Sequence, residues 1–162
     1  MSDTLITSRI ASFTPLPHRL EYVGEYQGIR FYNDSLATIP EATIHALSSL
    51  GSAVATLIAG GYDRHLDFAA LGAYLRSHPI VTLILFPDTG KKILQAIGTI
   101  RDKSIHTYEV TSMKEAVRLA YDTTPKRSIC VLSPASASYN LFHNYEDRGE
   151  QFKHWVTEFG NL

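Results

Sequence analysis

The sequence predicts an α/β fold of three layers (αβα), with a mostly parallel sheet and an antiparallel strand from an N-terminal hairpin. Apolar runs typical of strands alternate with segments whose apolar residues recur at helical spacing, which is the pattern of a parallel sheet covered by helices. The runs VATLIAGG and IVTLILF are apolar almost throughout, as in strands buried on both faces. The runs LEYVGEY and IRFYND flank Gln27-Gly28, which indicates the hairpin.

Local signals set the limits of the helices. Pro40 suits the first turn of a helix because its φ is fixed near the helical value, and Gly51 suits the end of the same helix. Ser112 followed by Glu115 is a capping-box pattern. The sequence predicts strands at 20–26, 29–34, 54–61, 80–86, 105–110 and 128–133, and helices at 39–51, 67–78, 90–100, 112–124 and 147–160.

The first residues form a separate segment in this pattern. Ser2-Asp3-Thr4 predicts the start of a short helix that runs through about Ala11, and Pro15 and Pro17 then break it. A short helix followed by a proline-stiffened link is typical of the passage from one domain to the next. We therefore expect residues 1–17 to be the end of a preceding domain plus a linker.

Composition excludes several classes of protein. The 162 residues are 44% hydrophobic, and Lys+Arg 15 against Asp+Glu 16 gives a net charge of -1, which argues against a nucleic-acid or membrane-surface partner. The single Cys130 lies in an apolar run and is expected to be a core residue in a reducing compartment. No apolar run reaches the roughly 18 residues of a membrane span, no signal peptide is visible, and the expected location is cytoplasmic.

The loops that follow the strands are where a ligand site is expected, because ligands bind at the carboxyl ends of parallel strands. Four of these loops are rich in polar residues: NDSLAT, AGGYDRHLDF, FPDTGKK and LSPASASYNLFHNYEDRG. None contains the G-x-G-x-x-G of dinucleotide sites. DTGKK lacks the full P-loop spacing, so we interpret it as a helix start capped by Asp88-Thr89. The His residues are scattered and no metal-like Cys/His cluster is present.

Three features of these loops are able to bind an anion, and each has a simpler interpretation. Arg64 follows two glycines at a strand end, where it either binds an anion or pairs with Asp63 or Asp67. The serines of SPASAS either form an anion cradle with free helix N–H groups or include one ordinary N-cap; they are Ser133, Ser136 and Ser138. The loop has no G-x-S-x-G, so a hydrolase nucleophile is not expected.

The predicted topology brings these features to one rim of the sheet. Thr38, Arg64 and Ser138 each follow a different strand, and together they supply a hydroxyl, a guanidinium and a second hydroxyl. These groups suit a small dicarboxylate. His18-Arg19, just before the hairpin, is either part of the site or a solvated pair beside the linker.

Four segments in order carry a resemblance to a known family: LPHRLE, NDS-AT-PEAT, GG-D---DF and LSPA-AS---F-NYE-RG-F. Together they resemble the C-terminal domain of the Mur ligases over about residues 8–160. The branch that it resembles most joins glutamate to UDP-N-acetylmuramoyl-alanine in peptidoglycan synthesis. Each segment alone is a weak signal, and the combination of four with the right α/β pattern between them is specific.

The resemblance implies a fold, partners and a share in a reaction. The family is a three-domain, ATP-dependent amino-acid ligase whose central domain holds the P-loop and Mg²⁺, and whose Rossmann-like C-terminal domain delivers the amino acid. Residues 18–162 would be this last domain, and residues 1–17 the end of the central domain plus linker. The implied partners are ATP, glutamate, UDP-N-acetylmuramoyl-alanine and the preceding domains, and the chain alone is expected to be inactive.

The resemblance also assigns residues. His18 and Arg19 match positions that meet the adenosine of ATP, and Asp34 matches the one that binds its ribose. The glutamate positions are Thr38 and Arg64 for the α-carboxylate, and Ser138 with the main chain near Tyr139 and Tyr145 for the side-chain carboxylate. No catalytic residue is assigned to this domain.

The sequence departs from the family at Leu36, where a lysine near the reacting phosphates is usual. Leucine neither neutralises phosphate nor donates a side-chain hydrogen bond. Two alternatives stay open: a Mur-type or folylpolyglutamate-type ligase for another amino acid, and a stand-alone Rossmann-like module that binds a nucleotide or a protein. The sequence does not distinguish D-glutamate from L-glutamate.

Overall fold

The structure is a computed structural model that describes residues 16–98 and 105–162. Within these residues a six-stranded sheet has the order β1-β2-β6-β3-β4-β5. β1 pairs antiparallel with β2 at one edge and all other pairs are parallel, which confirms the predicted mixed sheet. The strands are β1 Glu21–Tyr26, β2 Ile29–Asn33, β3 Val54–Gly61, β4 Thr82–Asp88, β5 His106–Glu109 and β6 Ile129–Leu132.

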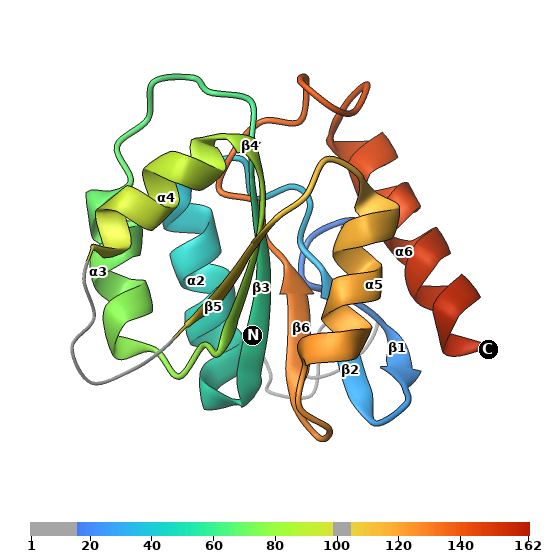
Figure 1. Cartoon of the computed structure of the whole chain (residues 1–162). Coiled ribbons are helices and arrows are strands. Elements are labelled where there is room, and N and C mark those ends of the chain that lie inside the picture. Colours follow the sequence, from blue (N-terminus) through green and yellow to red (C-terminus); the bar gives the residue numbers. More distant parts are fainter. Residues whose placement is uncertain (1–15, 99–104) are drawn as a thin grey trace, which may run out of the picture.

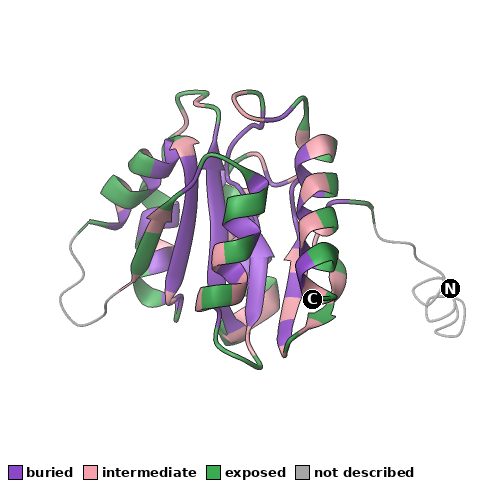
Figure 2. Ribbon diagram, turned by 45° about the vertical axis from the view of Figure 1, so that its right-hand side comes forward, coloured by how far each residue is buried: buried purple, intermediate pink, exposed green. Residues whose placement is uncertain are grey.

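Helices cover both faces of the sheet, as the apolar strands predicted. Figure 1 shows α2, α3 and α4 together on one face and α5 and α6 together on the other. Figure 2 shows the strands of the inner layer almost wholly buried between them. The helices are α2 Pro40–Leu50, α3 Ala69–Ser77, α4 Thr89–Ile97, α5 Met113–Thr123 and α6 Tyr145–Gly160, and a short 3-10 helix, η1 Gly51–Ala53, follows α2.

Each face of the sheet has its own apolar core, because successive side chains of a strand point to opposite faces. In β3, Leu57 and Ala59 pack with the residues of α2, α3 and α4, such as Leu71. Ile58, between them, packs with the residues of α5 and α6, such as Phe152. The eight residues of β3 are all buried, so this strand is the centre of both cores.

The path of the chain places the ends of three strands side by side. From β2 the chain passes over β6 to β3 and goes on to β4 and β5, with α2, α3 and α4 on one face. α5 then returns on the other face to β6, between β2 and β3. Right-handed crossovers require this change of face when the direction reverses. The carboxyl ends of β2, β6 and β3 are therefore neighbours.

The local signals for two helices are confirmed. α2 begins at Pro40 and ends at Leu50, and its C-cap is Gly51, whose φ of 69° is in the left-handed region that glycine accepts without strain. Ser112 is the N-cap of α5, and its hydroxyl accepts the Glu115 amide at 3.3 Å. The Glu115 carboxylate accepts the amide of Thr111 at 3.2 Å, one residue before the predicted partner.

Two expectations about helix starts are wrong. α4 begins after Asp88 as predicted, but the Asp88 side chain makes no capping hydrogen bond. Its carboxylate accepts from Asn140 at 3.1 Å instead. No helix begins directly after the three serines, because α6 begins at Tyr145 and its N-cap is Asn144, which accepts the Asp147 amide at 2.7 Å. The serines therefore neither cap α6 nor lie at its free N–H groups.

The short helix predicted to start at Ser2-Asp3-Thr4 and to run through about Ala11 lies outside the described residues. Among the residues that are described, no helix is long and apolar enough to cross a membrane. Cys130 is fully buried in β6, and burial raises its thiol pKa far above the ordinary value. This agrees with its prediction as a core residue.

Candidate functional site at the carboxyl edge of the sheet

Three loops meet where β2, β6 and β3 end. The loop after β2 contacts β6, since the Asp34 amide donates to the Leu132 carbonyl at 2.8 Å. The loop after β3 contacts the loop after β6, since the Tyr62 amide donates to the Ala137 carbonyl, also at 2.8 Å. Thr38, Arg64 and Ser138 thus follow three neighbouring strands of one edge, as the sequence predicted.

Asp34 is a buried carboxylate held from two sides. One oxygen accepts the Leu20 amide at 3.1 Å and the other accepts the Ser133 hydroxyl at 2.7 Å. Burial raises the pKa of Asp34 above its ordinary value, although these two donors and the charge of Arg19 act in the opposite direction. A buried acceptor with a fixed orientation is suited to binding hydroxyl groups.

A cavity of about 620 Å³ opens beside Asp34. It brings together two residues that the sequence assigned to ATP and one that it assigned to glutamate. One wall comes from the loops around β1 and β2, and the other from the outer face of α2. The residues that line the cavity include Arg19, Leu20, Asp34, Leu36, Ala37, Thr38 and His45. Arg64 and Ser138 do not line this cavity. The predicted site therefore has two parts. One is this cavity, which Thr38 lines; the other is a rim formed by the loops of Arg64 and Ser138.

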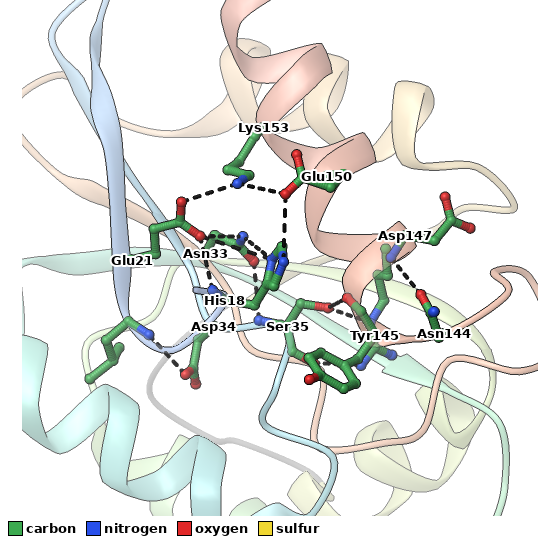
Figure 3. Close-up of polar contacts among 12 residues, drawn as sticks. His18, Glu21, Asn33, Asp34, Ser35, Asn144, Tyr145, Asp147, Glu150 and Lys153 are labelled. Carbon is green, nitrogen blue, oxygen red and sulfur yellow. Dashed lines mark hydrogen bonds and ion pairs between the residues drawn. The ribbon is translucent and has the colours of Figure 1, made fainter. Parts of the chain in front are cut away.

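His18 is part of the internal framework of this site. It is 5% exposed, and its ring Nδ1 is 2.9 Å from the Asn33 amide nitrogen, which identifies that ring nitrogen as the acceptor. Its Nε2 lies 3.5 Å from Glu150 of α6. Figure 3 shows the ring between Asn33 and Glu150, with Lys153 bridging Glu150 and Glu21. His18 is therefore not the solvated member of a surface pair.

Gly149 is needed for this position of His18. A Cβ at residue 149 would lie 2.2 Å from the ring Nδ1 of His18 and 3.0 Å from the side chain of Asn33. The glycine of the Arg-Gly pair in the fourth sequence segment is therefore required because a side chain at this position would collide with His18 and Asn33.

We expect Gly149→Ala to destabilise the domain by about 1–3 kcal/mol through overpacking against His18. An ordinary glycine inside a helix would give the opposite sign, since alanine is favoured there by about 1 kcal/mol. The free energy of unfolding in urea measures the effect. Glu158→Ala, on the exposed side of the same helix, is the control and should change it by less than about 0.5 kcal/mol. An unchanged or raised stability of Gly149→Ala would contradict the steric assignment.

Arg64 is exposed and available for a ligand. Its two proposed alternative partners do not bind it: no ion pair of Arg64 is found among the described residues, and Asp63 pairs with Lys92 and His65. The amide of His65 also donates to the Asp63 carboxylate at 2.8 Å, which fixes the turn before α3. Asp63 therefore holds the loop, and Arg64 projects from it.

The three serines have separate surroundings. The Ser133 hydroxyl donates a hydrogen bond to Asp34, and the Ser136 hydroxyl is 2.7 Å from that of Thr89. Ser138 is 2% exposed, and within the described part of the chain its hydroxyl makes no hydrogen bond. Of these three serines, Ser138 is thus the one whose hydroxyl is left for a ligand.

Tyr139 and Tyr145 differ in what they offer. Tyr139 is 67% exposed and packs edge-on to Tyr62, with ring centroids 6.2 Å apart. Tyr145 is half-buried; its ring lies edge-on to His18, and its carbonyl accepts the Ser35 hydroxyl at 2.8 Å. The carbonyl of Tyr145 is therefore engaged inside the domain, while Tyr139 lies at the rim.

Leu36 lines the cavity beside Asp34. Its amide donates to the His18 carbonyl at 3.0 Å, so the backbone of the loop is fixed there. The side chain adds apolar surface to a wall that also contains Leu20 and Ala37. The structure thus places the unusual residue on the side of Asp34 and Arg19.

The sequence did not indicate that Arg148 connects loops of the site. It is fully buried in the first turns of α6 and donates to Ser35 and Ser136, which belong to two of the three loops. The fourth sequence segment contained this arginine, but a charged residue at a helix start usually lies in solvent. Only its contacts with distant loops distinguish it.

The described residues contain no group of three His, Cys, Asp or Glu side chains that would hold a metal ion.

Comparison with protein families decides the affiliation. The family model of the Mur ligase glutamate ligase domain matches residues 18–136. The chain belongs to this Mur ligase family. The matched range contains the hairpin, the cavity beside Asp34 and the loops of Arg64 and Ser133.

Relatives of this Mur ligase domain are longer than the chain itself. It is 39% identical over 161 residues to the UDP-N-acetylmuramoylalanine--D-glutamate ligase of Acetivibrio thermocellus, covering 96% of this chain and 34% of that protein. It is also 39% identical over 149 residues to the enzyme of the same name from Cytophaga hutchinsonii, covering 92% and 32%. The chain thus spans about a third of the length of these curated relatives.

The fold of the Mur ligase domain agrees with a solved structure. The MurF ligase of Thermotoga maritima in complex with ADP has a TM-score of 0.58 at 17% identity, with 92% of this chain and 33% of that chain covered. At this identity the comparison shows the shared fold. It confirms the predicted three-layer architecture.

Proposed function

We propose that this chain is the C-terminal domain of an ATP-dependent ligase that joins glutamate to UDP-N-acetylmuramoyl-alanine in peptidoglycan synthesis. Residues 1–17 would be the end of the central domain plus the linker, and residues 18–162 the amino-acid-delivering domain. A cytoplasmic location and Mg²⁺ held by the central domain are parts of the same proposal. Its main support is that the buried Asp34 cavity and the Arg64–Ser138 rim share one edge of the sheet in a member of the Mur ligase family.

The cavity is the proposed adenosine site. The Asp34 carboxylate would accept from the ribose hydroxyls, which is its natural chemistry as an acceptor-only group. Arg19 is exposed at the mouth of the cavity and would meet the adenosine, while the buried His18 would support the loop that carries Arg19. A cavity of about 620 Å³ lies in the ordinary range of small-molecule sites.

The rim is the proposed glutamate site. Thr38 and Arg64 would bind the α-carboxylate, with Arg64 providing a charge-assisted fork. The free Ser138 hydroxyl and the main chain near Tyr139 and Tyr145 would bind the side-chain carboxylate. When both carboxylates are bound, the α-amine is the polar group of glutamate that remains free to react.

The proposed reaction has two steps. The terminal phosphoryl group of ATP is transferred to the alanine carboxylate, which gives an acyl phosphate and ADP. The amine nitrogen then attacks the acyl carbon; the C–N bond forms, the bond to phosphate breaks, and the nitrogen loses a proton. The share of this domain is to orient the amine toward the acyl carbon, and closure of the domains assembles the site.

The test compares this chain with the complete protein. With ATP, Mg²⁺, glutamate and UDP-N-acetylmuramoyl-alanine, we expect phosphate release that depends on glutamate from the complete protein and none from the chain alone. Titrating the 15N-labelled chain with ADP should shift the amide signals of Asp34 and Thr38. Turnover by the chain alone would contradict the division of labour, and a coding sequence without an upstream P-loop segment would contradict the ligase assignment.

The amino acid is tested by a panel on the complete protein, with D-glutamate and L-glutamate as separate members. A preference for another amino acid would identify a related Mur-type or folylpolyglutamate-type ligase. In that case the cavity keeps its proposed role and the assignment of the rim to a dicarboxylate fails.

A further inference from the structure

Arg148 links loops of the proposed glutamate site through hydrogen bonds made in the interior of the domain. Its Nε donates to the Ser35 hydroxyl at 3.0 Å and its Nη2 to the Ser35 carbonyl at 2.8 Å. Its Nη1 donates to the Ser136 carbonyl at 3.0 Å. These contacts span 113 residues of sequence on one side and 12 on the other. One guanidinium thus connects α6, the loop after β2 and the loop after β6.

The end of β3, which leads into the third loop, lies close to the same guanidinium. A Cβ added to Gly61, the last residue of β3, would lie 3.3 Å from the Arg148 Nη1 and 2.3 Å from the Ala137 carbonyl. The glycine therefore allows the backbone that leads to Arg64 to lie against the guanidinium. Thr38, Arg64 and Ser138 each lie within three residues of a residue beside this guanidinium. These residues are Ser35, Gly61 and Ser136.

The charge of Arg148 is buried without a carboxylate. The residue is 0% exposed, and no Asp or Glu of residues 16–98 and 105–162 forms an ion pair with it within 4.0 Å. Burial lowers the pKa of Arg148 to about 9, so the group still carries its positive charge at neutral pH. Its acceptors are two carbonyls and a hydroxyl, which are neutral.

Such an arrangement is unfavourable for the domain by itself. Removing a cation from water costs several kcal/mol that neutral acceptors do not fully restore, and an apolar residue of similar size is often at least as stable. A negatively charged ligand above the three loops would offset this cost. Because electrostatic attraction is strong where water is excluded, a buried cation favours an anion even without touching it.

We propose that Arg148 is a positioning residue for the amino-acid substrate, holding the three loops in register and attracting the substrate's second carboxylate from beneath the site. The inference rests on the proposed function, since it requires a dicarboxylate at the rim. Arg64 would meet one carboxylate directly, and Arg148 would act on the other through Ser136 and the backbone that leads to Ser138.

The experiment uses the complete protein with three variants. Arg148→Met removes the charge and keeps much of the side-chain volume, and Arg148→Lys keeps the charge and removes the fork of donors. Arg76→Met is the matched control: Arg76, in the last turn of α3, also donates to two backbone carbonyls, those of Ala96 and Ile97 at the C-terminal end of α4, away from the carboxyl edge of the sheet. The readouts are KM for glutamate, KM for ATP, kcat and the temperature of unfolding.

We expect Arg148→Met to raise KM for glutamate by about 10- to 100-fold, the size of a lost charge-assisted interaction, with KM for ATP changed by less than threefold. Arg148→Lys should recover part of the affinity for glutamate, and Arg76→Met should change neither KM. A role limited to stability would lower the unfolding temperature and alter both KM values or neither.

Each outcome decides the inference. Arg148→Met with an unchanged KM for glutamate, or with equal changes in both KM values, overturns it. If Arg148→Met does not fold, Arg148→Lys carries the test: a glutamate KM raised at least threefold with an unchanged ATP KM supports the inference, and a wild-type glutamate KM overturns it. A wild-type protein that does not consume glutamate overturns the proposed function and the inference together, whereas the preceding outcomes leave the proposed function intact.

Discussion

Arg64→Ala in the complete protein is expected to lower kcat/KM for glutamate. The expected loss of transition-state stabilisation is about 2–5 kcal/mol, the cost of leaving a desolvated charge without its partner. Arg64 is exposed and makes no ion pair with the described residues, while the adjacent Asp63 is held by Lys92. Removing the Arg64 side chain therefore breaks no ion pair or hydrogen bond within residues 16–98 and 105–162. The loss should appear in glutamate use, and the unfolding temperature should stay the same.

Two variants sharpen this prediction. Arg64→Lys keeps the charge and removes the planar fork, so it should recover part of the activity. Lys126→Ala removes an exposed positive charge before β6, at the opposite end of the sheet, and should leave glutamate kinetics unchanged. If steady-state kinetics show the same kcat/KM for Arg64→Ala and wild type, the α-carboxylate is bound elsewhere.

Asp34→Asn should separate ATP binding from stability. Loss of the carboxylate is expected to raise KM for ATP by about 10- to 100-fold, since hydrogen bonds to a charged group contribute about 1.5–3 kcal/mol. The internal network tolerates the amide. Its oxygen can still accept the Leu20 amide, its nitrogen can donate to Ser133, and the Ser133 hydroxyl can donate to Thr43, 3.0 Å away.

The difference in stability between this variant and wild type should depend on pH with a definite sign. Burial raises the pKa of Asp34 in the folded state, so the folded protein is favoured when the carboxyl is protonated and loses that stability as pH rises through the folded-state pKa. Asp34→Asn lacks this loss. Its free energy of unfolding should equal or exceed that of wild type at neutral pH. The difference should shrink as pH falls through the raised folded-state pKa, and it should vanish below the unfolded-state pKa of about 4.

Asp34→Ala is the control for the network. It leaves the Ser133 hydroxyl and the Leu20 amide without their acceptor, so it should be destabilised at every pH by about 1–3 kcal/mol. Urea unfolding between pH 3 and pH 8 measures all three proteins. If Asp34→Asn is destabilised as strongly as Asp34→Ala at neutral pH, the carboxylate is not the costly state of Asp34.

The regular elements of the fold were predictable because their signals are local. The buried strand 54–61 was recognised as an apolar run, and the helix from Pro40 to Gly51 by its first and last residues. Such signals depend on backbone preferences and on spacing within a few residues. The predicted Asp88 cap was wrong because local signals do not reveal distant partners. The Asp88 carboxylate accepts a hydrogen bond from Asn140, a residue 52 positions away.

The site was predictable only in part. Thr38, Arg64 and Ser138 were placed on one edge because parallel strands present their carboxyl ends together. The uses of individual side chains were not predictable: His18 proved to be a buried support, Ser133 the partner of Asp34, and Arg148 a link between loops. Each of these roles is defined by a contact whose partner the local sequence does not reveal.

The sequence by itself determined the alternation of strands and helices, the parallel sheet with its hairpin edge and the family resemblance carried by four spaced segments. Only the tertiary structure decided which polar residues are occupied within the fold and which remain free for ligands. The physical reason is the return of α5 to β6, which inserts that strand between β2 and β3. It brings Ser133 to Asp34 across 99 residues and Arg148 to Ser35 across 113, contacts that depend on the topology of the sheet.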